Sequence, residues 1–176
     1  MQERRSKARL TAATLLLLAA MLRGPAGPGP AMAQPPPDSL KITVSPGLVN
    51  FALKPSGISQ GSFPITVTTS WQIQRGGTEV RVYAYFAPPS VALANPLGGA
   101  IPSARVFGRV NSGAFQPFTG TSPLGPGGSL LIFGQQVRNN KQLTRSDSLD
   151  LQIDTTGLNL SPGAYSGSLR VQALAL

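Results

Sequence analysis

Carboxylates are the side chains with which this chain of 176 residues would do acid–base chemistry, because it contains no histidine and no cysteine. Asp150 and Asp154 alternate with apolar residues in a two-residue pattern. A β-strand would therefore place both on one face, roughly 13 Å apart. Glycosidases use two carboxyl groups at shorter separations. The spacing indicates two acids on a solvent-facing surface and not a catalytic pair.

Metal-binding and nucleophilic residues are equally sparse. Asp147 and the Asn139-Asn140 pair supply oxygen atoms of the kind that Ca²⁺ prefers, but at no known loop spacing, so calcium is the weaker interpretation. Lys54 and Lys141 lie in turn-like segments and not in an apolar pocket that would activate an amine. Without histidine and cysteine, Ser-His-Asp and Cys-His arrangements are excluded, and zinc sites lose their usual ligands. We expect no catalytic residue, no metal and no cofactor, and thus a protein that is not an enzyme.

Two tyrosines form the best candidate contact surface. The segment 79–87 alternates as a strand whose apolar residues face inward, which places Arg81, Tyr83 and Tyr85 on its outer face. Exposed tyrosines two residues apart are suited to contact a cell-surface protein or a polysaccharide. The alternative is that a second layer or a loop covers them.

The N-terminus is predicted to be a secretory signal peptide. A positively charged head is followed by thirteen uncharged, mostly apolar residues, 10–22, and then by the small residues of Ala31-Met32-Ala33. We expect cleavage between Ala33 and Gln34, so that residues 1–33 are the signal, 34–39 a proline-rich leader and 40–176 the folded domain. The protein would be secreted, periplasmic or on the cell surface, with no integral membrane segment after signal removal. An uncleaved anchor helix is the alternative.

The charge that remains after signal removal argues against a nucleic-acid partner. Ten Lys/Arg and five acidic residues follow the predicted cleavage position, giving a net charge of +5 in place of +9 for the whole chain. These basic residues are scattered, with no basic run and no interleaved aromatic patch. Small exported domains often use disulfides, but without cysteine this domain depends on its core alone.

Two-residue alternation in almost every segment predicts an all-β fold. We expect a two-sheet antiparallel β-sandwich of seven or eight strands, immunoglobulin-like, with no amphipathic helix. The longest alternation, 62–73, places Phe63 and Trp71 on one inward face. Trp71 is interpreted as a core anchor, and a ligand-stacking platform is the alternative. The apolar segment 129–137 is expected to be covered on both faces.

The first and last strands of the domain are predicted to lie at an edge and to pair inside the domain, respectively. The first strand, 41–44, is interrupted at Pro46, which is typical of an edge strand. Residues 138–146 are predicted to be a polar turn, and 147–176 a strand, a turn and a strand. We expect the last strand to pair inside the domain, next to Leu149–Ile153, because the prolines of 34–39 cannot donate ladder hydrogen bonds to a neighbouring subunit.

The run Ser161-Pro-Gly-Ala-Tyr-Ser-Gly-Ser-Leu-Arg-Val171 resembles the ending of small exported bacterial immunoglobulin-like sandwiches, among them spore coat protein U-like and fimbrial-subunit-like domains. The opening Ile42–Pro46 is similar to their first strands. The resemblance implies a structural or adhesive domain at the cell surface, in which self-association or a pilus-type assembly is an option. The cysteines common in those proteins are missing here. A carbohydrate-binding module that uses the tyrosines is the alternative, and a degenerate hydrolase is the third.

The signal-peptide prediction is tested by the protein that the cell exports. We expect protein recovered outside the cytoplasm to begin at Gln34, as determined by N-terminal sequencing or intact mass. An Ala33→Leu variant is the control, since a bulky residue before the cut should block processing. Full-length chain retained in the inner membrane would contradict the prediction.

Overall fold

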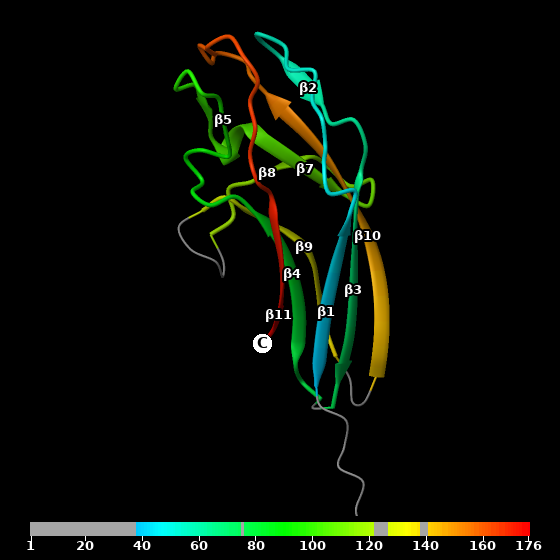
Figure 1. Ribbon diagram of the computed structural model, residues 1–176. Coiled ribbons are helices and arrows are strands. Elements are labelled where there is room, and N and C mark those ends of the chain that lie inside the picture. The colour runs from blue at the N-terminus through cyan, green and yellow to red at the C-terminus, as the bar shows by residue number, and fades with distance from the viewer. Residues whose placement is uncertain (1–37, 75, 122–126, 138–140) are drawn as a thin grey trace, which may run out of the picture. The chain divides into compact units, whose positions relative to one another are not determined.

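The computed structural model describes residues 38–176, except residues 75, 122–126 and 138–140. This part of the chain has eleven β-strands, one 3-10 turn, η1 (Ser103–Arg105), and no α-helix (Figure 1). All of the strand pairings are antiparallel. The all-β prediction is confirmed, although short strands raise the number above the expected seven or eight. The predicted signal peptide, its cleavage site and most of the leader lie outside the described residues.

The larger sheet is organised around one long strand. Its order is β1 (Ser39–Ser45), β3 (Ile65–Ile73), β10 (Lys141–Asp154), β7 (Val106–Val110) and β8 (Gln116–Pro117), with β2 (Ile58–Gln60) also paired to β10. The first half of β10 pairs with β3, and the second half with β7 and β2. The predicted polar turn over 138–146 is therefore wrong from Lys141 onward. The charged residues Arg145 and Asp147 occupy inward positions there, so the segment lacks the alternation of apolar and polar residues that indicates a strand.

The smaller sheet contains the last strand. Its order is β11 (Arg170–Ala175), β4 (Glu79–Tyr85) and β9 (Ser129–Gln136), and a separate hairpin joins β5 (Leu93–Ala94) to β6 (Ala100–Ile101). The last strand pairs inside the domain, as predicted, but with β4 and not with Leu149–Ile153. The reason is that the segment between β10 and β11 crosses from one sheet to the other. β10 therefore packs against the core from the larger sheet, and β11 packs against it from the smaller sheet.

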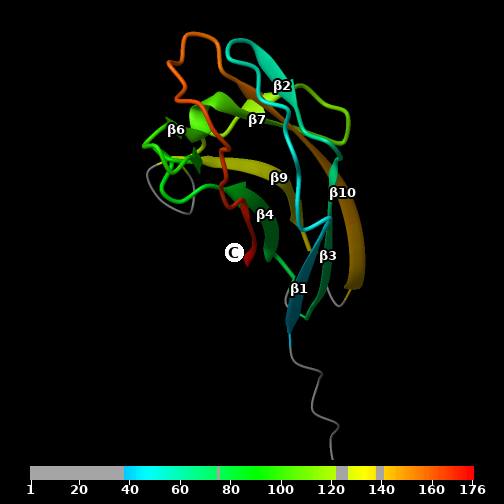
Figure 2. The ribbon, with the colours of Figure 1, turned by 45° about the horizontal axis from the view of Figure 1, so that its top comes forward.

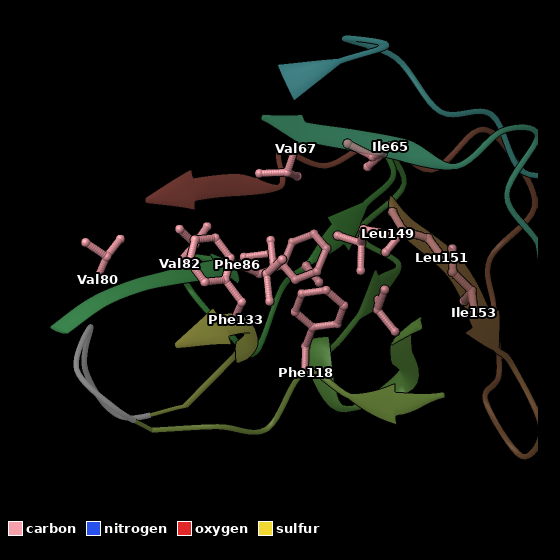
Figure 3. Packing of buried hydrophobic residues seen from close by; sticks show 14 of the residues in the cluster. Ile65, Val67, Val80, Val82, Phe86, Phe118, Phe133, Leu149, Leu151 and Ile153 are labelled. Carbon is pink, nitrogen blue, oxygen red and sulfur yellow. The ribbon is translucent and has the colours of Figure 1, made fainter. Parts of the chain in front are cut away.

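The core lies between the two sheets in a β-sandwich-like arrangement. Figure 2 shows β4 and β9 on one side and β3 and β10 on the other. Side chains from both sheets point into the space between them, including Val67, Val82, Phe133 and Leu149 (Figure 3). Trp71 is 1% exposed, and its ring centroid lies 5.9 Å from that of Phe133. Its prediction as a core anchor is confirmed.

Two residues predicted to be inside are exposed. Phe63 is 63% exposed because β3 begins only at Ile65. Leu131 is 48% exposed because β9 contains a bulge, which leaves Ile132 as an extra residue between the pairs Val82–Phe133 and Tyr83–Leu131. The bulge turns two successive residues of β9 inward and Leu131 outward, so this strand is not covered on both faces.

The segment that precedes β11 is fixed by a tyrosine hydroxyl and a glycine. Tyr165 Oη donates a hydrogen bond to the Ser161 carbonyl at 3.1 Å, which closes the loop before β11. Asn95 Nδ2 donates to the same carbonyl at 3.2 Å. At Gly167 an added Cβ would collide with the Ala92 carbonyl oxygen. These contacts hold the segment before β11 against the residues on either side of β5.

Trp71 makes the core prediction testable. We expect Trp71→Ala to lower the free energy of unfolding by about 3–5 kcal/mol, since it leaves a large cavity between the sheets. Trp71→Phe is the matched control and should cost much less, because the indole Nε1 has no hydrogen-bond partner among the described residues. Denaturant unfolding measures both variants. A red-shifted, freely quenched emission from this single tryptophan, with an unchanged melting temperature in Trp71→Ala, would contradict the assignment.

Candidate interaction surfaces

The predicted tyrosine surface is only partly formed. Arg81, Tyr83 and Tyr85 share the face of β4 that points away from the core, but Tyr83 is 5% exposed and Tyr85 is half-buried. The Arg81 guanidinium donates a hydrogen bond to the Glu79 carboxylate at 2.7 Å, and this bond, together with the neighbouring Tyr83, raises the pKa of Arg81. The expectation of an exposed Tyr83 is wrong: its side chain is buried on the central strand of the smaller sheet, between β11 and β9. A contact role for this surface stays a prediction for Tyr85 and Arg81.

Two edge strands, β1 and β11, are in contact on one flank of the sandwich. Within the described residues, β1 pairs only with β3, and β11 only with β4. The half-buried side chains of Ile42 and Val171 pack against the core at this seam, whereas Val44 is 41% exposed. The edge position predicted for the first strand is confirmed, and the seam beside β11 was not predicted.

A recess of about 390 Å³ lies at one end of the seam, where β1 begins and β11 ends. Its lining is formed by Asp38, Ser39, Leu40, Ile73, Thr78, Ala175 and Leu176. The Asp38 carboxylate accepts a hydrogen bond from the Gln74 backbone N–H at 2.8 Å, so it already caps the end of β3. The recess is thus a widening of the seam and not a separate chemical site.

The outer face of β1, β3 and the first half of β10 is an array of hydroxyl and amide groups. The strand registers align its residues in four rows of three, and every member is exposed or half-buried. We name this array the hydroxyl face. Its rows are Ser39–Gln72–Gln142, Lys41–Ser70–Thr144, Thr43–Thr68–Ser146 and Ser45–Thr66–Ser148.

Asp147 is the one buried carboxylate among the described residues. Arg145 donates to both of its oxygens, at 2.7 and 2.8 Å, and Asn111 Nδ2 donates to Oδ1. The Arg145 guanidinium also lies 4.7 Å from the centroid of the Phe133 ring. Burial alone would raise the pKa of Asp147, but the hydrogen bonds from Arg145 and Asn111 and the arginine charge outweigh it, so this pKa is lowered. The cluster holds β10 to the turn after β7.

The remaining acids of β10 are in ion pairs and do not form a catalytic pair. Asp150 lies 3.1 Å from Arg109, and Asp154 lies 3.7 Å from Arg105. No cluster of three or more His, Cys, Asp or Glu side chains that could hold a metal occurs in the described part of the chain. Asp147, the one described residue of the weak calcium hypothesis, is occupied by Arg145, and Asn139-Asn140 lie outside the described residues.

The Asp147 cluster predicts an acid-sensitive fold. Because the folded pKa of Asp147 lies below its unfolded value of about 3.9, its contribution is fully present above pH 4 and is lost as pH falls through the folded pKa. We expect Asp147→Asn to lower the stability at pH 7 by about 1–3 kcal/mol and to flatten the loss of melting temperature between pH 5 and 2. A variant whose pH dependence equals that of the wild type would contradict this role.

No match to a family model, to a curated protein or to a solved structure is found for this chain. The resemblance of residues 161–171 to spore coat protein U-like and fimbrial-subunit-like domains therefore stays a prediction. In residues 38–176, as far as they are described, no helix has the length and apolar character needed to cross a membrane. The function has to be argued from the surfaces described above.

Proposed function

We propose that this protein is a non-catalytic extracytoplasmic domain with a structural or adhesive role, built on an immunoglobulin-like sandwich. The observation that carries the proposal is the seam at which β1 and β11 lie side by side without strand pairing. Edge strands present unpaired backbone N–H and C=O groups that another strand can join. Ile42 and Val171 would supply apolar contacts along the same seam.

The engagement of the acidic side chains supports the non-catalytic part of the proposal. Each of the five acids after residue 37 is bound by an arginine or by a backbone N–H, at separate places on the domain. Where a carboxyl pKa is shifted, as in Glu79, Asp147 and Asp154, it is lowered, which keeps these groups ionised at neutral pH. A general acid needs the opposite shift.

The predicted signal peptide supports the extracytoplasmic part of the proposal, since it would deliver the domain to the cell surface or beyond. The partner would be a cell-surface protein or another copy of this chain, joined along a strand edge. The alternative, carbohydrate binding by the tyrosines, is weakened because Tyr83 is buried.

The proposal is tested by self-association and by attachment to the producing cells. We expect the native protein to be monomeric at low micromolar concentration, to unfold cooperatively, to associate at higher concentration and to attach to those cells. Sedimentation measures self-association, and the binding of protein-coated beads to the cells measures attachment. Val44→Lys puts a charge on the β1 edge and should reduce both. Val91→Lys is the matched control, because these valines are 41% and 39% exposed.

Each outcome has a distinct meaning. If Val44→Lys and Val91→Lys behave alike, the strand edges are not the contact. If the wild-type protein stays monomeric at every concentration and does not attach to cells, the structural or adhesive role is wrong. If it aggregates at low micromolar concentration unless a strand peptide is added, the domain is incomplete alone and takes a donor strand from a neighbour.

A further inference from the structure

The hydroxyl face is a separate surface with an unusual chemical composition. Among its twelve residues, nine carry hydroxyl groups, two are glutamines and one is Lys41. It contains no acid, no aromatic ring and no aliphatic side chain. Hydroxyls of neighbouring strands are paired, Thr68 with Ser146 and Ser70 with Thr144, each at 2.9 Å. These bonds fix four of the twelve side chains, and each hydroxyl keeps further capacity to accept or donate.

Charged residues are concentrated elsewhere on the domain. Ten Lys/Arg and five acidic residues follow residue 37, and Lys41 alone belongs to the hydroxyl face. The outer face of the smaller sheet carries the Glu79–Arg81 pair, and the other half of β10 carries the Asp150–Arg109 pair. The hydroxyl face is therefore nearly neutral in a basic protein.

This composition excludes several kinds of partner. Nucleic acids and acidic polymers are held by clustered Lys and Arg, which are missing here. The centres of protein interfaces are rich in aromatic residues, methionine and arginine, and none of these lies on this face. A membrane surface would need an apolar or a basic face. A ligand that matches the face must be uncharged and must both donate and accept hydrogen bonds repeatedly.

We propose that the hydroxyl face binds a neutral polysaccharide. Sugar hydroxyls donate and accept hydrogen bonds as Ser, Thr and Gln side chains do, so the two surfaces match in chemistry and in charge. Side chains on one face repeat at roughly 6.8 Å along a strand, and strands are about 4.8 Å apart, which gives a ligand with a regular repeat several equivalent positions. Because each bond to sugar replaces one to water, binding to a single domain is weak.

The inference goes beyond the strand-edge contact of the proposed function, because it uses another surface and another class of ligand. The side chains of Ser39, Lys41, Thr43 and Ser45 point outward on β1, whereas Val44 lies on the opposite face of that strand. Val44→Lys therefore leaves polysaccharide binding unchanged, and loss of strand-edge association leaves this inference standing. The two proposals can fail independently.

Affinity electrophoresis of the native protein tests the inference. The probes are the neutral polysaccharides dextran and galactomannan in the gel, with binding to insoluble cellulose and chitin measured by depletion. We expect retardation or depletion by at least one probe. Thr43→Val/Thr66→Val should weaken it roughly tenfold, because each change removes a ligand hydrogen bond while keeping the side-chain shape. Thr119→Val/Thr121→Val, at exposed threonines outside the face, is the matched control and should have no effect.

Salt and charge separate the inference from electrostatic adsorption. Binding should survive 0.5 M NaCl and the Lys41→Gln substitution, since the ligand is uncharged. Failure of all four neutral probes overturns the inference. It is also overturned if binding needs low salt or Lys41, or if the two threonine double variants weaken binding equally. Circular dichroism of each variant shows that its fold is retained.

Discussion

The burial of one face of β3 is the interaction on which the rest of the structure depends, because the chain has no cysteine with which to cross-link itself. Ile65, Val67 and Trp71 lie between the sheets and are almost fully buried. Removal of apolar surface from water, about 25 cal/mol per Å², is the main favourable term that offsets the lost chain entropy. The other face of the same strand is then left for hydroxyl groups, so one alternation creates both the core and a candidate binding surface.

The parts of the fold that follow from local alternation could be predicted from the sequence. The inward faces of β3 and β4 and the burial of Trp71 depend on residues close together in the chain, although β3 begins three residues later than expected. The pairing of β11 with β4 could not be predicted, because alternation gives a strand its faces but not its neighbours. The first half of β10 was missed because Arg145 and Asp147 occupy positions where apolar residues are expected.

The candidate surfaces could be predicted less well than the fold. Tyr83 was correctly placed on the outer face of β4, but its burial there depends on neighbouring strands that periodicity does not identify. The hydroxyl face was not predicted, because its serines and threonines are the outward residues of three strands that are far apart in the sequence. Only the registers of β1 and β10 against β3 show that these residues line up in rows. The edge position of β1 could be predicted because Pro46 interrupts the segment locally.

The length of β10 has a consequence for the order in which the domain can form. Thr68 on β3 and Ser146 on β10 are partners separated by 78 residues, and β2 and β7 also pair with β10. A chain that emerges N-terminus first therefore presents β1 and β3 long before their central neighbour arrives. Long-range pairing of this kind slows folding. The larger sheet can therefore close only once β10 has joined β3 to β7 and β2.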